Sequence, residues 1–335
     1  MKVLYFVHTY GERNGISNHV ESMVKNLPEE IRWEVIAGSG SGLPFFSSLK
    51  MPLMEIWKAL FSDFDVMHIH GYGNFYSYFG TWVCLLRNKP LVWTIHGYPR
   101  ISGARRVIYH VYRNLMAPLI FWKASRIISV SSDILPMLLL ETKKRINVIP
   151  NGVDLDFFSS KNSYRKAKFV CYVGRLDPDK MAMRLLECQS HPLLFIGPDE
   201  DGTRKKIEKE ASYEGMTVEF REVQYGQMPS EYEKCRYIVL PSKYEGFPLT
   251  LLEATAMERP FISTDVGEVR STLASLFEKP EKFLLEGNLQ EKINDMEKIN
   301  LEGELESARK RATTYSWKSI AVKVGAIYFE VAKKN

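Results

Sequence analysis

The sequence has little cysteine and no long hydrophobic run. Its four cysteines, at positions 84, 171, 188 and 235 of 335, show neither metal-ligand nor disulfide spacing. No apolar stretch approaches the ~18–20 residues that span a bilayer, and the apolar start at residues 2–8 is too short for a signal peptide. We therefore expect unpaired cysteines, a reducing cytoplasmic setting and no membrane-spanning segment.

Two common nucleotide and nucleic-acid signatures are also absent. The glycine-rich stretch 38–42 has Leu43 where Gly-x-Gly-x-x-Gly needs its third glycine, and no acidic residue ends a following strand. This argues against a dehydrogenase. No nucleic-acid recognition module is present, so we expect no nucleic-acid partner.

Charge is unevenly distributed along a chain whose overall composition is that of a soluble globular protein. Residues 1–150 carry a net charge of +7, against −2 for the remainder. Basic and aromatic residues alternate over residues 98–126, which suits peripheral binding to an anionic membrane or contact with a polyanionic substrate. A solvated helix face over an ordinary core is an equally valid interpretation.

Short β-prone runs alternate with helical stretches twice along the chain. The predicted strands are 2–8, 33–37, 66–70, 91–96, 126–130 and 147–149, then 169–173, 193–196, 218–220, 238–240 and 261–263. This alternation predicts an α/β protein with two Rossmann-like, doubly wound parallel sheets. The turn-forming residues 150–154 place the boundary near Gly152, and residues 317–333 predict a final amphipathic helix.

Two glutamates in residues 241–257 are the leading site candidates. Glu245 follows the predicted strand on a loop, and Pro248 suits the first position of a helix that carries Glu253. A helix N-terminus attracts phosphate, and carboxylates accept hydrogen bonds from sugar hydroxyls. The alternative is an acidic, solvated helix face.

Two cations form a second candidate group. Arg175 and Lys180 flank a turn after the strand 169–173, where both could reach phosphate oxygens. Asp177 and Asp179 between them could hold Mg²⁺ on a diphosphate, but the neighbouring cations make a metal unnecessary, and we expect none. An ordinary surface ion pair is the alternative.

Histidines and a glycine complete the candidates. His96 ends a predicted strand, where it could bond sugar hydroxyls or phosphate, or be structural. His68 and His70 alternate along one strand, but the pattern contains no third metal ligand. Gly15 would allow a ligand to approach the backbone at a helix start.

These motifs resemble the retaining nucleotide-sugar glycosyltransferases of glycosyltransferase family 4, which have the GT-B fold. The matching stretches are 14–16, 65–70 (Asp-Val-Met-His-Ile-His), 94–97 (Thr-Ile-His-Gly), 148–154, 174–180, 240–254 and 264–267. The resemblance implies two lobes facing each other across a cleft. Residues 1–151 would bind the acceptor, with a helix at 316–335 packing back on them, and residues 152–315 would bind the donor.

The resemblance also implies roles for single residues. Arg175 and Lys180 would hold the diphosphate, with catalytic Glu245 on the donor sugar. Glu253 would grip the ribose, and His96 would contact the sugar or its phosphate. The other implied residues are Gly246, Phe247, Pro248, Leu249 and Thr250 in the donor site, and Asn14, Gly15 and Ser131 in a phosphate and acceptor loop.

The chain departs from the family pattern at several positions. Asn14 replaces one of two glycines, and Met181 follows Lys180 where glycine is usual. The stretch from residue 181 to 195 is short, which predicts the loss of part of a helix. The other departures are 258–260, in place of a Cys-Gly-x-Pro turn, and Glu268, in place of a second glycine.

The implied activity is transfer of a hexose from a nucleoside-diphosphate sugar, with UDP-sugars favoured, to a hydroxyl of a saccharide or lipid-linked acceptor. The anomeric configuration would be retained and no cofactor used. Two alternatives stay open, namely another GT-B nucleotide-sugar enzyme such as an epimerase, and a non-catalytic nucleotide-sugar binding protein.

Overall fold

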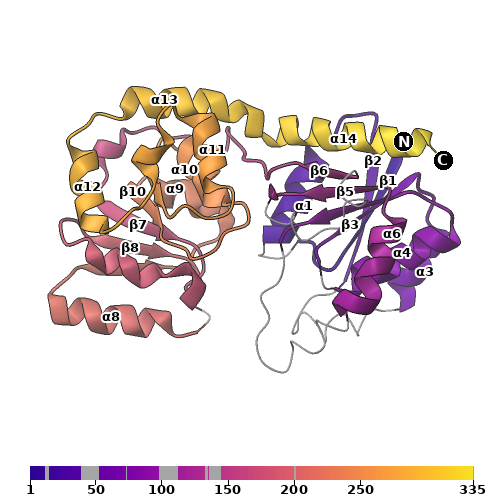
Figure 1. Cartoon of the computed structure of the whole chain (residues 1–335), viewed down its shortest axis with the longest axis horizontal. Helices are drawn as coiled ribbons and strands as arrows, with labels where there is room; N and C mark the ends of the chain where they lie inside the picture. Colours follow the sequence, from indigo (N-terminus) through magenta and orange to yellow (C-terminus); the bar gives the residue numbers. More distant parts are fainter. Residues whose placement is uncertain are drawn as a thin grey trace. The chain divides into compact units, whose positions relative to one another are not determined.

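The chain forms two compact units, each described by itself (Figure 1). Unit 1 comprises Met1–Asn151 and Trp317–Asn335, and unit 2 comprises Gly152–Ser316. The computed structural model describes residues 1–11, 15–38, 53–72, 74–97, 112–132, 135, 145–199 and 201–334. Much of the basic and aromatic segment 98–126 lies outside these ranges, as does Asn14.

Unit 1 contains a parallel sheet in the order β2-β1-β3-β4-β5-β6. Its strands are β1 Lys2–Val7, β2 Arg32–Ala37, β3 Val66–His70, β4 Leu91–Ile95, β5 Arg126–Ser129 and β6 Ile146–Val148. Every residue of β3 and β4 is buried. Such continuous burial is typical of parallel strands covered on both faces.

Helices cover both faces of this sheet. Those of unit 1 are α1 Gly15–Lys25, α3 Leu53–Phe61, α4 Phe75–Leu86, α6 Ala117–Lys123 and α14 Trp317–Lys333, with a π-helical turn at Tyr112–Met116. Helices α1 and α14 share one core with β1, while α3, α4 and α6 share the other. The apolar face of α14, including Ile320, Val324 and Tyr328, is buried in the first of these cores.

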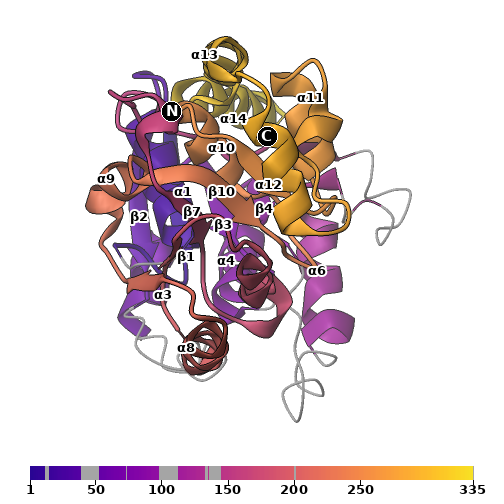
Figure 2. The same ribbon diagram turned by 90° about the vertical axis from the view of Figure 1, so that its left-hand side faces the viewer.

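Unit 2 contains a second parallel sheet, in the order β11-β10-β7-β8-β9. Its strands are β7 Phe169–Val173, β8 Leu193–Ile196, β9 Val218–Arg221, β10 Cys235–Leu240 and β11 Phe261–Ser263. The α-helices are α8 Thr203–Glu214, α9 Met228–Tyr232, α10 Leu249–Ala256, α11 Val269–Leu276, α12 Leu289–Glu297 and α13 Glu302–Arg311. Helix α8 lies on one side of the sheet, and α10, α11 and α13 lie on the other (Figure 1, Figure 2).

The prediction of two parallel α/β sheets is confirmed, with small errors at element ends. Helix α10 starts at Leu249, so Pro248 is its N-cap and not its first helical residue. The segment after Lys180 is short, as predicted, because a single 3₁₀ helix, Ala182–Glu187, leads from there to β8. No helix in the described ranges has the length and hydropathy to cross a bilayer.

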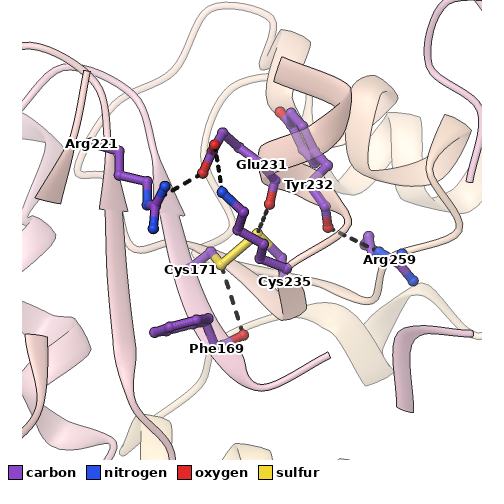
Figure 3. The surroundings of a disulfide bond; sticks show 8 residues. Phe169, Cys171, Arg221, Glu231, Tyr232, Cys235 and Arg259 are labelled. Atoms are coloured by element: carbon purple, nitrogen blue, oxygen red, sulfur yellow. Dashed lines mark hydrogen bonds and ion pairs between the residues drawn. A yellow bond between two sulfur atoms is a disulfide. The ribbon is translucent and has the colours of Figure 1, made fainter. Parts of the chain in front are cut away.

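Cys171 and Cys235 form a disulfide between the neighbouring strands β7 and β10 (Figure 3). The expectation of four unpaired cysteines is therefore wrong. Their Cα atoms are 5.6 Å apart across a sequence separation of 64 residues. Cysteine spacing could not reveal the pair, because β7 and β10 are neighbours only in the folded sheet. The cysteine argument for a reducing compartment therefore no longer holds.

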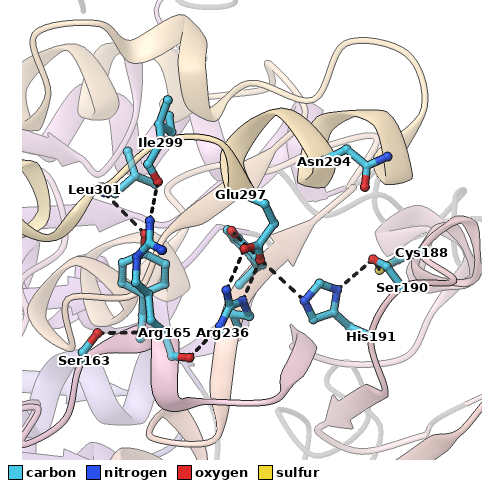
Figure 4. Close-up of polar contacts among 12 residues, drawn as sticks. Ser163, Arg165, Cys188, Ser190, His191, Arg236, Asn294, Glu297, Ile299 and Leu301 are labelled. Atoms are coloured by element: carbon cyan, nitrogen blue, oxygen red, sulfur yellow. Dashed lines mark hydrogen bonds and ion pairs between the residues drawn. The ribbon is translucent and has the colours of Figure 1, made fainter.

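A polar network joins helix α12 to the amino ends of β8 and β10 (Figure 4). The guanidinium of Arg236 donates two hydrogen bonds of 2.6 Å to the carboxylate of Glu297, and Tyr237 donates a third at 2.9 Å. His191 lies 3.5 Å from the same carboxylate. Paired bonds from arginine hold a carboxylate in one geometry, so this network fixes α12 at the amino edge of the sheet.

Two departures from the family pattern have left-handed backbone. Met181 has φ 50° and ψ 35°, and Glu258 has φ 52°. Met181 follows Lys180 at a position where the family usually has glycine, and Glu258 lies in the turn that replaces Cys-Gly-x-Pro. A residue with a Cβ atom is destabilised in this conformation by roughly 1–2 kcal/mol. The fold therefore preserves backbone geometry that glycine would adopt without strain.

We predict that Met181→Gly raises the free energy of unfolding by ~1 kcal/mol, because glycine removes the Cβ strain. Met183→Gly is the matched control, since it lies in the following 3₁₀ helix without positive φ and should lower stability by roughly 0.5–1 kcal/mol. Urea unfolding measures both. A loss of stability in Met181→Gly equal to that of the control would contradict the strain argument.

Candidate active site

The candidate donor residues gather at the carboxyl edge of the sheet in unit 2. Strands β7 and β10 are neighbours in this sheet, so the loops that follow them start side by side. Lys180 lies at the end of one loop and Glu245 in the other, and the Lys180 Nζ atom is 2.5 Å from Glu245 Oε1. The motifs suggested each group separately, the family resemblance implied one donor site for both, and the sheet order brings them together.

Glu245 is held as an acceptor in a nearly buried position. Its exposed fraction is only 8%, and Oε1 also accepts a hydrogen bond of 2.7 Å from the Ser242 hydroxyl. A buried carboxylate without such partners would be destabilising. The ion pair with Lys180 and the hydrogen bond from Ser242 together compensate the burial of the Glu245 carboxylate.

The loop that carries Arg175 is built around Asp177. The Asp177 carboxylate accepts a hydrogen bond of 3.0 Å from the Lys180 backbone N–H and caps a short 3₁₀ helix, Pro178–Lys180. It also lies 3.5 Å from the Arg175 guanidinium, whose side chain is 55% exposed. This gives Asp177 a structural role, and leaves Arg175 and Lys180 on one short, capped turn.

Close backbone packing supports the loop that carries Glu245. A Cβ atom at Gly267, whose φ is +54°, would lie 2.0 Å from the Glu245 carbonyl oxygen. The Glu268 N–H donates to the Gly246 carbonyl at 3.2 Å, and the Lys243 N–H donates to the Asp179 carbonyl at 2.8 Å. The two candidate loops are therefore tied to each other and to the segment after β11.

Helix α10 presents its N-terminus beside this loop. Pro248 is the N-cap and makes no side-chain cap hydrogen bond, and the helix proper begins with Leu249 and Thr250. The first N–H groups of a helix have no intrahelical acceptor and carry partial positive charge. Together with Lys180 they form an electropositive setting suited to phosphate oxygens. Phe247, between Glu245 and the helix, packs against Tyr315 with ring centroids 6.3 Å apart.

Glu253 lies on α10 in a different environment from Glu245. It is 8% exposed, and its Oε2 atom accepts a hydrogen bond of 2.6 Å from the Tyr232 hydroxyl. Burial raises the pKa of the Glu253 carboxyl to about 7, while hydrogen bonds from Tyr232 and Tyr225 oppose that rise. No cation is among these contacts, which suits a group that accepts hydrogen bonds from uncharged hydroxyls.

The candidates in unit 1 lie at the carboxyl edge of its own sheet. His96 directly follows β4 and is partly buried, with its Nε2 atom 3.1 Å from His70 Nδ1. Burial lowers the pKa of His96 well below its usual value, and His19 and His68 lower it further. Ser131 is buried beyond the end of β5, where its N–H donates to the Ser129 hydroxyl at 3.3 Å.

Other predicted residues have simpler explanations. Asn14 lies outside the described residues. A Cβ atom at Gly15 would meet no described atom within 4 Å, so the described part of the chain does not require glycine there. His68 is buried with both ring nitrogens in hydrogen bonds, to the Tyr328 hydroxyl at 2.5 Å and the Thr94 hydroxyl at 2.7 Å.

Several contributors were missed at the level of sequence. Ser242, three residues before Glu245, and Tyr232, which bonds Glu253, lack a motif of their own. Tyr232 lies on α9 before β10 and Glu253 on α10 after it, so only the packing of these two helices reveals their contact. His19 and Asn151, joined by a hydrogen bond of 2.9 Å, are 132 residues apart in sequence.

We predict a change in pH dependence for Glu253→Gln. The Glu253 pKa is about 7 when folded and ~4.3 when unfolded. Between these two pH values the folded state binds the Glu253 proton more tightly than the unfolded state does. The free energy of unfolding therefore falls as the pH rises from about 4.5 to about 7, by roughly 3 kcal/mol in all. Urea unfolding from pH 5 to 8 should therefore show a flatter profile for Glu253→Gln.

Glu306→Gln is the control, because that carboxylate is exposed on α13 and should leave the slope of the wild-type profile nearly unchanged. Equal slopes for wild type and Glu253→Gln would refute the raised pKa.

Comparisons with known proteins identify the family of each unit. Residues 13–157 match the family model described as Glycosyltransferase Family 4, and residues 154–316 match that described as Glycosyl transferases group 1. No curated protein matches the sequence.

Solved structures of similar fold cover nearly the whole chain. Sucrose-phosphate synthase from Thermosynechococcus elongatus is 18% identical with a TM-score of 0.75, covering 100% of this chain and 99% of that one. Anabaena HepE in complex with UDP is 16% identical with a TM-score of 0.74, covering 98% and 100%. The catalytic domain of starch synthase IV from Arabidopsis thaliana, bound to ADP and acarbose, is 13% identical with a TM-score of 0.74, covering 99% of each chain.

These structures share the fold, and the two family models together span residues 13–316. The predicted GT-B fold is thereby confirmed. The chain belongs to the GT-B glycosyltransferases of the family 4 type.

Proposed function

We propose that the protein transfers a hexose from a nucleoside-diphosphate sugar, with a UDP-sugar favoured, to a hydroxyl of a saccharide or lipid-linked acceptor. The anomeric configuration is retained, and no metal ion or other cofactor takes part. The observation that carries this proposal is the contact of Lys180 Nζ with Glu245 Oε1 beside the N-terminus of α10. It brings a cation and a carboxylate to the edge of the sheet where helix α10 begins.

The chemistry follows from where charge develops. The bond between the anomeric carbon and the phosphate oxygen breaks, and its electron pair stays on the diphosphate. Lys180, Arg175 and the first N–H groups of α10 stabilise that charge. The acceptor oxygen bonds to the anomeric carbon on the face that the diphosphate leaves, and its proton passes to a phosphate oxygen. No covalent sugar–enzyme intermediate is needed for retention along this route.

The two glutamates bind hydroxyls in this scheme. Glu245 accepts hydrogen bonds from the donor sugar, and Glu253 accepts them from the ribose through lone pairs that Tyr232 and Tyr225 leave available. A carboxylate can bind vicinal hydroxyls through several lone pairs. His96 is assigned to the donor sugar or its phosphate. Support for a UDP-sugar comes from HepE, of which structures with UDP and with UDP-glucose are known.

An epimerase and a non-catalytic binding protein remain the alternatives. An epimerase would change the sugar of the donor without transferring it. A binding protein would hold the donor and leave it unchanged, and loss of Lys180 or Glu245 would then affect binding alone. The products of a turnover assay distinguish all three.

We predict that Lys180→Ala lowers kcat by ~10²–10³, the usual effect of removing one group that stabilises developing charge. Glu245→Gln should also lower kcat, because it breaks the ion pair and weakens the acceptor. The assay incubates UDP-, GDP- and ADP-sugars with saccharide and lipid-linked acceptors, with and without EDTA, and NMR determines the anomeric configuration of the product. EDTA should not reduce the rate.

Lys243→Ala is the matched control, since this exposed lysine lies in the same loop and contributes only its backbone N–H to the contact with Asp179. It should retain wild-type kcat. A wild-type protein that transfers no sugar to any acceptor would remove the transferase proposal. Wild-type rates in both Lys180→Ala and Glu245→Gln would remove the site assignment.

We also propose peripheral association with an anionic membrane through the basic and aromatic segment 98–126. Within its described part, Trp122 on α6 is 68% exposed and adjoins Lys123. Other exposed apolar side chains lie on the helices of the same face of unit 1, namely Trp57 and Phe61 on α3 and Trp82 and Leu86 on α4. Exposed tryptophan beside lysine suits the headgroup region.

The double variant Trp122→Gln/Lys123→Gln should bind anionic vesicles at least ~5-fold more weakly, since one lysine near such a surface contributes ~1 kcal/mol. Co-sedimentation with vesicles of phosphatidylserine and phosphatidylcholine at low and high salt measures this. Tyr213→Gln, at a 78% exposed aromatic of unit 2, is the control. An absence of wild-type binding, or an equal loss in the control, would contradict the proposal.

A further inference from the structure

Three histidines of unit 1 converge from separate elements. His19 lies on α1, His70 ends β3 and His96 follows β4. One ligand nitrogen from each lies within 4.8 Å of the other two. The His19 ring meets the His96 ring edge to face, with centroids 4.7 Å apart, while His70 and His96 stack at 5.4 Å.

The spacing fits a tetrahedral ion. Two imidazole nitrogens that bind one Zn²⁺ at ~2.05 Å are about 3.3 Å apart in tetrahedral geometry. The distance from His70 Nδ1 to His96 Nε2 is 3.1 Å. The third nitrogen, from His19, needs to move inward by no more than about an ångström and a half to complete the set.

The groups around the cluster prepare it for a metal ion. The Nδ1 atom of His19 pairs with Asn151 Oδ1 at 2.9 Å, which leaves Nε2 as its ligand atom. A metal-bound histidine commonly donates its other N–H to an oxygen in this way. Burial lowers the pKa of His19 to about 4 and lowers those of His70 and His96 well below their usual values, so all three are neutral at pH 7.

His70 differs from His19 in the pairing of its second ring nitrogen. It is 1% exposed, and its Nε2 atom, which is not the proposed ligand atom, has no hydrogen-bond partner among the described residues. Buried polar atoms normally have one. His68, the fourth histidine of this region, differs because both of its nitrogens are in hydrogen bonds. The cluster therefore comprises three histidines without His68, and the His70 ring has only one of its two nitrogens in a hydrogen bond.

We propose that His19, His70 and His96 form a binding site for a divalent transition metal ion, represented by Zn²⁺. Three histidines leave one position of a tetrahedral ion open for water or another oxygen ligand. The site is separate from the proposed metal-independent transfer reaction. If His96 contacts the donor as proposed above, bound Zn²⁺ occupies its Nε2 atom and inhibits transfer, and a chelator reverses the inhibition.

Direct binding tests the site without any turnover assay. Chelator-treated, desalted protein without a polyhistidine tag is titrated with Zn²⁺ by calorimetry, and with Co²⁺ while its visible absorption is recorded. The wild type should bind one equivalent and give the intense absorption of tetrahedral Co²⁺. Since loss of a partner outside the ligand set already weakens metal binding 10–100-fold, loss of a ligand should weaken it more than ~100-fold.

The variants remove the ligand atoms selectively. His19→Asn and His96→Asn each remove the Nε2 atom and keep an amide near the position of Nδ1. His70→Gln removes the Nδ1 atom. His191→Gln in unit 2 is the control and should bind as the wild type does. His96 is partly exposed, so His96→Asn is the substitution that disturbs packing least, and thermal unfolding without metal confirms that each variant is folded.

Three outcomes would overturn the proposal. They are the absence of stoichiometric Zn²⁺ binding in the wild type, binding that survives His96→Asn in folded protein, and equal loss in His191→Gln. Because none of these depends on a sugar donor, failure of the metal site and failure of the proposed transferase activity are distinguishable.

Discussion

The ion pair between Lys180 and Glu245 is the interaction on which the candidate active site depends. It joins two loops that leave neighbouring strands, and it compensates a carboxylate that is 8% exposed. The surrounding contacts position its two ends, since Asp177 caps the lysine turn and Gly267 lets the backbone pack against the Glu245 carbonyl. Removing one partner of such a pair leaves a nearly buried charge, which is far less stable than the pair itself.

Structural and chemical roles are divided between the two edges of the sheet in unit 2. At the amino edge, the network of Arg236 and Glu297 anchors α12 (Figure 4). The disulfide between Cys171 and Cys235 joins β7 to β10 (Figure 3). At the carboxyl edge, the charged groups face loops and a helix N-terminus. Ligand sites of parallel sheets lie at this edge. The stabilising contacts named above, the Arg236–Glu297 network and the disulfide, lie elsewhere in the sheet.

Much of the fold could be predicted from the sequence because β-prone runs reveal buried strands directly. Strands 169–173, 193–196 and 261–263 were predicted at their observed limits. Strand order could not be predicted, and two outcomes share that cause. The adjacency of β7 and β10 brings Lys180 to Glu245, which spacing alone left as separate candidates, and it also pairs Cys171 with Cys235, which spacing led us to exclude. The histidine cluster depends likewise on contacts between elements that are distant in sequence.

The buried polar groups of the two units differ in charge and in pairing, and this difference determines which ligands each unit can bind. In unit 2, carboxylates are kept beside a lysine, tyrosine hydroxyls and a helix N-terminus. A diphosphate and sugar hydroxyls can bind in such a setting without a further counter-ion. In unit 1, burial keeps the histidines neutral, so they offer nitrogen lone pairs and no positive charge. A neutral imidazole has one lone pair and one N–H, so it can bond a hydroxyl, a phosphate oxygen or a metal ion, but it adds no charge to neutralise an anion. In the proposed reaction, unit 2 would therefore stabilise the leaving diphosphate, while the unit 1 histidines would contribute uncharged hydrogen-bonding or ligand atoms.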